Sequence, residues 1–210
     1  MPNFVPSLGL VVGLFLSMTL RADEKDARSF IHEYIKSFEL MKVSGRMMSS
    51  NKKATKLGDL VAWVDFKKNR LRFEYKAISH EDSFGVYLVD SKYLQATGKD
   101  FKYVPMELKE KGVLAAFAQL LFGIHEGKAW KNVIIEQLFA WESKFSSGTQ
   151  TVSLVPAVDS LNFKKADFLF TDTGKLYRVA IQSEKDQMDE LYISSIGSQS
   201  SKNFPIVKFK

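Results

Sequence analysis

The sequence predicts an α+β fold, in which an antiparallel β-sheet has one apolar face covered by helices. Apolar and polar residues alternate over Val61–Ala77, strictly so in its second half, which indicates a β-hairpin with one aromatic and one basic face. Two stretches, Asp23–Met41 and Gly112–Phe122, instead have helical character. Phe is common, with 17 copies in 210 residues. Such a chain has either a large filled core or a cavity for an apolar ligand.

The N-terminus resembles an export signal. Leu8–Leu20 is apolar and too short to span a bilayer, and Ala22 offers a small residue for cleavage. We therefore expect residues 1–22 to be a cleaved signal peptide and residues 23–210 to form one soluble domain. The first seven residues contain no Lys or Arg, so an uncleaved anchor is the alternative.

The first element of the mature chain is a predicted helix over Asp23–Met41. Its apolar residues recur at helical spacing, and acidic residues cluster at its start, where negative charge suits the helix dipole. The stripe consists of Ala27, Phe30, Ile31, Tyr34, Ile35 and Phe38. A strand follows, in which Met41, Val43, Gly45 and Met47 alternate with polar residues.

The hairpin over Val61–Ala77 comes next and turns near Lys67-Lys68-Asn69. Its apolar face is expected to hold Ala62, Val64, Phe66, Leu71, Phe73 and Tyr75. Its solvent face is expected to hold Trp63, Asp65, Arg70, Arg72, Glu74 and Lys76. None of these residues forms a motif for bond-breaking chemistry.

The middle of the chain is predicted to contain a second hairpin, an edge strand and a buried helix. Gly85–Val89 and Tyr93–Thr97 form the hairpin, and Pro105 limits Phe101–Leu108 to a sheet edge. Gly112–Phe122 is rich in Ala and Leu, which favours a helix packed against the sheet. The pattern of Trp130–Trp141 suits either a helix or a strand.

The C-terminal part is predicted to be an antiparallel meander. Its strands lie at Thr149–Val155, around Ala166, Phe168 and Phe170, at Leu176–Gln182 and at Glu190–Ile196, with a tight turn at Asp172-Thr173-Gly174. Gly197–Asn203 is expected to be a polar loop and Phe204–Phe209 a last short strand.

No catalytic or metal-binding motif is found. The chain has no Cys, which excludes disulfides and thiolate metal sites. His32-Glu33 and His125-Glu126 lack the second His of a zinc-protease helix, and neither a P-loop nor a G-x-S-x-G elbow is present. We predict no cofactor, no metal site and no enzymatic activity; an exported hydrolase, which would need a triad, is the alternative. The net charge of +6 favours acidic partners or anionic lipid surfaces over nucleic acid.

Four stretches resemble the LolA family of periplasmic lipoprotein carriers, in the same order and at similar spacing. Val61–Tyr75 resembles the family's strand pair, with Leu71 and Phe73 at its Phe and Trp positions. Val89–Pro105 is similar to its "S-D-G-K-x-L-W-x-Y" segment. Val152–Ile181 is similar to its "L-x-P" strand and the following hairpin, and Asn203–Phe209 to its closing strand.

The resemblance implies an incomplete antiparallel β-barrel, a curved sheet whose apolar concave face is covered by helices. Together with strand alternation, it assigns a lipid-binding cavity to Val64, Phe66, Leu71, Phe73, Tyr75, Phe168 and Phe170. The lid would contain Phe30, Ile31, Tyr34, Phe117, Leu120 and Leu121. Lys67 and Lys68 stand where the family has the Arg-Pro whose Arg holds the lid shut, so they are the candidate latch. A dry, filled core is the alternative.

The function implied is that of a periplasmic carrier without a catalytic step. It would act as a monomer on acylated lipoproteins, which it would receive from an inner-membrane ABC transporter and pass to an outer-membrane acceptor. Without a Cys, the chain differs from the family's lipid-anchored receptor relatives. A LolA-like binding or sensor protein for another lipid or apolar ligand is the alternative.

Overall fold

The computed structural model describes residues 27–89, 92–98, 102, 104–105, 121–122, 125, 129–130, 133–134, 139–156, 163–183 and 187–206. Residues 27–36 form a helix, residues 121, 122 and 125 are also helical, and short helical turns lie at His80–Asp82 (η1) and Ser201–Asn203 (η5). The first strands are β1 (Leu40–Ser50), β2 (Thr55–Asp65), β3 (Arg70–Ala77), β4 (Phe84–Val89), β5 (Lys92–Thr97), β6 (Val104–Pro105), β7 (Ala129–Trp130) and β8 (Val133–Ile134). The last are β9 (Phe139–Ser146), β10 (Thr149–Pro156), β11 (Phe163–Thr171), β12 (Leu176–Ser183) and β13 (Met188–Gln199).

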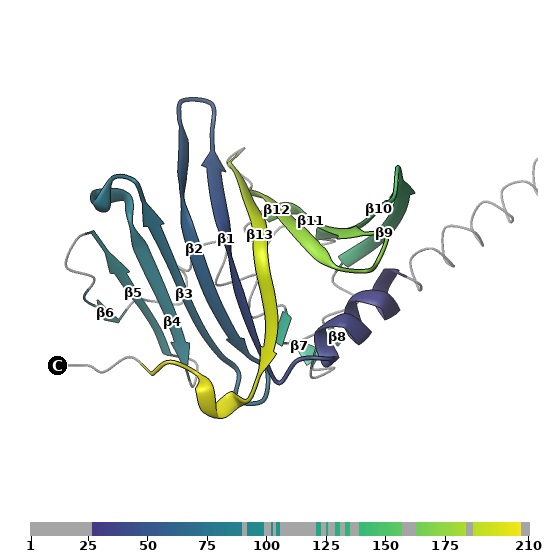
Figure 1. Ribbon diagram of the computed structural model, residues 1–210, viewed down its shortest axis with the longest axis horizontal. Coiled ribbons are helices and arrows are strands. Elements are labelled where there is room, and N and C mark those ends of the chain that lie inside the picture. Colours follow the sequence, from purple (N-terminus) through teal and green to yellow (C-terminus); the bar gives the residue numbers. More distant parts are fainter. Residues whose placement is uncertain are drawn as a thin grey trace, which may run out of the picture.

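Eleven of these strands form one antiparallel sheet in the order β6-β5-β4-β3-β2-β1-β13-β12-β11-β10-β9. Two meanders, β1–β6 and β9–β13, therefore meet where β1 pairs with β13. Figure 1 shows that the sheet curves, so that β9–β12 turn away from the plane of β1–β6. Irregular register at Ser44/Gly45 and Leu169/Phe170 contributes to this bend, because bulges increase local twist. The sheet ends at β6 and β9, so it is an unclosed barrel, as predicted.

The predicted hairpins are confirmed. β2 and β3 pair with Val64 opposite Leu71 and Ala62 opposite Phe73, and β4 pairs with β5. Turn residue Asn69 has φ 50° and Gly174 has φ 75°, backbone conformations that Asn and Gly tolerate. Pro105 lies in the two-residue edge strand β6, where its missing N–H removes no ladder bond from the sheet interior.

Three element boundaries were predicted wrongly. The first helix ends at residue 36 rather than Met41, because Leu40 and Met41 already pair in β1. β13 continues to Gln199, so Gly197 belongs to a strand rather than to a polar loop. Residues 204–206 are not a strand; the remainder of the predicted Phe204–Phe209 strand lies outside the described residues. In the described ranges, no helix has both the length and the apolar character needed to cross a bilayer.

The two faces of the sheet carry separate apolar clusters. The larger one occupies the concave face and joins the helix residues Ala27, Ile31 and Ile35 to both meanders. The smaller one, on the opposite face of β2–β5, consists of Leu40, Tyr87, Leu94 and Phe204 with Trp63 packed against them. Covering of the concave face by a second helix stays a prediction, since Gly112–Leu120 lies outside the described residues.

Candidate functional site

An apolar cavity of about 100 Å³ lies on the concave face, between the two meanders. The first meander contributes residues from β1, β2 and β3: Met41, Val43, Met47, Leu60, Ala62, Val64, Leu71 and Phe73. The second contributes residues from β11, β12 and β13: Phe168, Leu176, Val179, Ile181, Asp189, Glu190, Leu191 and Ile193. Leu121 completes the lining. Most of the lining residues alternate along their strands, as a pleated sheet requires, whereas in β13 the consecutive residues 189–191 all border the space.

Four of the seven predicted cavity residues line this space: Val64, Leu71, Phe73 and Phe168. The other three are buried in the same apolar cluster but pack beside the cavity. The Phe66 ring stacks on His125 at 4.8 Å, Tyr75 lies 5.2 Å from Phe84, and Phe170 contacts the helix. Sequence reasoning missed the β1 and β12–β13 contributions, although the alternation of Met41, Val43 and Met47 was a usable signal. That these residues hold a lipid stays a prediction.

The helix over residues 27–36 packs on the concave side of β11. Rings of Phe30 and Tyr34 meet the fully buried Phe170 edge-on, with centroids 4.9 and 5.2 Å apart. Burial raises the pKa of Tyr34, and a hydrogen bond with the Leu176 backbone acts in the opposite direction. Of the predicted lid residues, Phe30, Ile31 and Tyr34 therefore touch the sheet cluster, and Leu121 lines the cavity. Phe117 and Leu120 lie outside the described residues.

The candidate latch residues lie at the β2–β3 turn, close to the connection between the helix and β1. The Lys67 ammonium is 3.4 Å from the Glu39 carboxylate, and both side chains are largely exposed. The backbone N–H of Phe66 donates to the Glu39 carbonyl at 3.0 Å. Lys68 contributes its backbone N–H, which donates to Asp65 at 3.1 Å. The turn is thus tied to Glu39, which lies between the helix and β1. Of the two candidate latch residues, Lys67 is the one whose side chain takes part.

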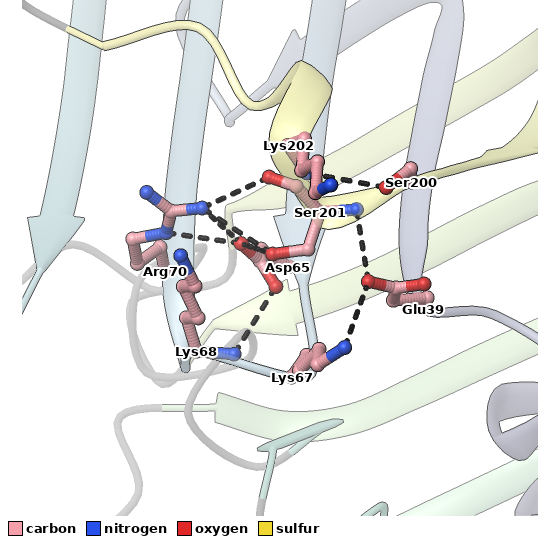
Figure 2. A network of polar contacts seen from close by, with 8 residues as sticks. All are labelled: Glu39, Asp65, Lys67, Lys68, Arg70, Ser200, Ser201 and Lys202. Atoms are coloured by element: carbon pink, nitrogen blue, oxygen red, sulfur yellow. Dashed lines mark hydrogen bonds and ion pairs between the residues drawn. The ribbon is translucent and has the colours of Figure 1, made fainter.

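Figure 2 shows that these contacts belong to a larger polar network around Asp65. The Asp65 carboxylate is fully buried, pairs with the Arg70 guanidinium and accepts a hydrogen bond from the Ser201 hydroxyl at 2.7 Å. The Ser201 backbone N–H donates to Glu39 at 3.2 Å. The network therefore joins the helix–β1 connection, the β2–β3 turn and the segment after β13.

The prediction that Asp65, Arg70 and Arg72 of the β2–β3 hairpin face solvent is wrong. Residues 200–206 cross over it, and the Arg70 guanidinium lies 4.3 Å from the centre of the Phe204 ring. Arg72 donates to the Pro205 carbonyl at 3.4 Å and lies over Trp63 at 5.5 Å. Asp65, Arg70 and Arg72 are consequently buried or half-buried, because a distant segment covers side chains that the alternation assigned to water.

Two acidic residues of β13 lie at the cavity lining and have different partners. Glu190 pairs with Arg178 and accepts from the Tyr192 hydroxyl at 3.0 Å. Asp189 accepts, among the described residues, from the Gln187 side-chain amide, at 2.9 and 3.2 Å. Burial, Asp82 and Asp189 together raise the pKa of Tyr75. Among the residues described, no group of three His, Cys, Asp or Glu could hold a metal ion.

No family model and no curated protein matches the sequence. Three solved structures illustrate the similarity in fold. A DUF1329 family protein from Desulfovibrio piger has a TM-score of 0.44 at 5% identity, over 85% of this chain and 94% of that one. A LolA superfamily protein from Nitrosomonas europaea has 0.42 at 8%, over 85% and 94%. A domain described as outer membrane lipoprotein-sorting, from Vibrio parahaemolyticus, has 0.40 at 9%, over 81% and 92%.

The set of similar structures thus includes the family that the sequence resembles. Because the identities are below 10%, these structures are similar in fold alone, and what this chain can bind depends on its own residues.

Proposed function

We propose that this chain is a periplasmic carrier that binds the acyl chains of lipoproteins in the concave cavity. The observation that carries the proposal is the cavity itself, whose lining is apolar except for Asp189 and Glu190 and which draws on both meanders. A filled core would leave no such space. An apolar space between two halves of a curved sheet instead suits a chain of methylene groups.

The cavity must widen to take such a ligand. Its volume of about 100 Å³ is below the roughly 150 Å³ that admits a benzene ring, and far below the roughly 300–1,000 Å³ of ordinary ligand pockets. The helix over residues 27–36 is the element that can yield, since Phe30 and Tyr34 attach it to Phe170 by side-chain contacts rather than by a strand ladder.

The energies of opening and of binding are compatible with reversible loading. Burial of about twelve methylene groups yields roughly 10 kcal/mol at ~0.8 kcal/mol each. Each aromatic pair between the helix and Phe170 contributes on the order of 1 kcal/mol beyond its buried area. A lid that is a few kcal/mol more stable closed than open would therefore open for cargo and close again after release.

The proposed cellular role is supported by the predicted export signal and by the family resemblance of the sequence. Cargo would come from an inner-membrane ABC transporter and pass to an outer-membrane acceptor, with no covalent step. The second candidate is a periplasmic binding or sensor protein for another lipid. It rests on the same cavity, and mass spectrometry of the ligand retained after gentle purification separates the two.

The lid is tested by hydrogen exchange of the purified protein with and without a diacylated peptide. We expect residues 27–36 and 112–122 to exchange faster than β1 and β2, and to change protection when the peptide binds. Phe30→Ala should speed exchange of the helix, because it removes a contact with Phe170. The matched control is Phe145→Ala, since that ring lies exposed in β9. A helix as protected as the central strands and unresponsive to peptide would contradict the lid.

A further inference from the structure

Of the two acids at the cavity lining, Asp189 is the one that no cation among the described residues balances. Asp189 lies directly opposite Ile181 in the β12–β13 ladder, and residues opposite each other share a face of the sheet. Ile181 lines the cavity, so the Asp189 carboxylate belongs to the same face. Within the described part of the chain, its side chain accepts hydrogen bonds from the Gln187 amide, and the residue is 6% exposed.

Glu190 differs from Asp189 in the face of the sheet that it occupies and in having a cation that balances its charge. It lies opposite Ala180, on the other face of the sheet, and its charge is balanced by Arg178. The Tyr192 hydroxyl donates to its second oxygen at 3.0 Å. Among the described residues, no Lys, Arg or His lines the cavity. Asp189 is therefore the charged group on the cavity's face of the sheet that no described cation balances.

A buried carboxylate beside an apolar space discriminates between ligands by the charge of their polar end. A carboxylate or phosphate bound within several ångströms of Asp189 would be repelled in a medium of low dielectric constant. A protonated amine would be attracted, and an amide N–H could donate to the acceptor positions that Gln187 leaves open. Water does not screen this interaction well, because Asp189 is buried.

We propose that the cavity selects acyl or alkyl chains whose polar end is a nitrogen donor, an amine or an amide, and rejects chains that end in a carboxylate or phosphate. Asp189 is the selecting residue. The inference rests on the proposed function, since it requires that the cavity bind such chains. Free fatty acids and anionic phospholipids are thereby poor ligands, even though their chains match the apolar lining.

The test measures displacement of the uncharged dye Nile red from the full-length purified protein, below the micelle concentration of each probe. Three probes share a twelve-carbon chain: dodecylamine, N-dodecylacetamide and dodecanoate. We expect the amine and the amide to bind at least tenfold more tightly than dodecanoate. In Asp189→Asn the difference between dodecylamine and dodecanoate should fall to about threefold or less, since the side chain keeps its shape and loses its charge.

The control is Asp59→Asn, which removes the same charge from a side chain that is 81% exposed and should leave the preference unchanged. Equal binding of dodecanoate and dodecylamine by the unaltered protein overturns the selectivity, whether or not Asp189→Asn folds. A preference that survives Asp189→Asn, with native circular dichroism, overturns the assignment to Asp189. If neither Nile red nor any probe binds, the proposed function fails and the selectivity with it.

Discussion

Removal of the Asp65 carboxylate should destabilise the protein more than any surface charge change. In Asp65→Ala, the Arg70 side chain would remain only 12% exposed and lose its counter-charge. The Ser201 hydroxyl and the Lys68 backbone N–H would also lose their acceptor. Breaking one side of a buried ion pair costs about 3–5 kcal/mol, because the remaining charge is neither solvated nor paired.

The contributions can be separated with further variants. Ser201→Ala should cost about 1.5–3 kcal/mol, the range for a hydrogen bond to a charged group. The double variant Asp65→Ala/Arg70→Ala should lose less than the sum of the two single variants, by roughly 2 kcal/mol, since each single variant leaves an orphaned charge and the double variant leaves none. Asp59→Ala is the matched control: its carboxylate lies 4.0 Å from Arg46 and both side chains are largely exposed, so about 0–1 kcal/mol is expected.

Equilibrium unfolding in urea measures these differences, with the m-value required to stay constant. In a thermal melt, Asp65→Ala should lower Tm by about 6–20 °C, from ~2–4 °C per kcal/mol for a chain of this size. Equal losses for Asp65→Ala and Asp59→Ala would refute the reasoning. So would strict additivity in the double variant, because it would mean that Asp65 and Arg70 do not interact.

Two further predictions concern the sheet. Gly45→Ala should cost about 1–3 kcal/mol in urea unfolding, because a Cβ there would lie 2.2 Å from the Tyr192 carbonyl oxygen. Gly197→Ala has open space and should stay within ~0.5 kcal/mol; equal losses would exclude the clash. Tyr75→Phe should leave stability at pH 7 unchanged or higher by about 1 kcal/mol, since that buried hydroxyl has no hydrogen-bond partner in the structure. The raised pKa of Tyr75 means that the folded state holds the proton more tightly, so stability is retained below pH 10 and falls as pH rises above it. Unfolding followed from pH 9 to 11.5 should fall less steeply in Tyr75→Phe, and identical slopes would contradict the assignment.

Much of the sheet could be predicted from the sequence, because a strand's period of two is a local property of the backbone. Leu71, Phe73 and Tyr75 are buried as their alternation required, and Pro105 and Gly174 stand where their backbone restrictions allow. The composition of the concave face was predictable for the same reason. The end of the helix was not, because Met41 continues its apolar stripe, and only the pairing of β1 with β13 and β2 places Leu40 and Met41 in a strand.

The site was predictable only where it depends on one strand at a time. Val64 and Phe168 reach the same cavity, yet nothing local indicates that their strands lie in opposite meanders joined by β1 and β13. Asp189 and Glu190 are adjacent acids in the sequence; their registers place them on opposite faces, and among the described residues a cation, Arg178, pairs with Glu190 but not with Asp189.

The sequence by itself determined which residues alternate, and hence the strands and the apolar face of the sheet. Only the tertiary structure decided which polar residues are buried. Asp65 occupies a solvent-facing position in its own strand, but Ser201, 136 residues away, covers it and donates to it. A polar side chain can leave water only where its hydrogen bonds and charge are satisfied, and those partners come from segments that folding alone brings together.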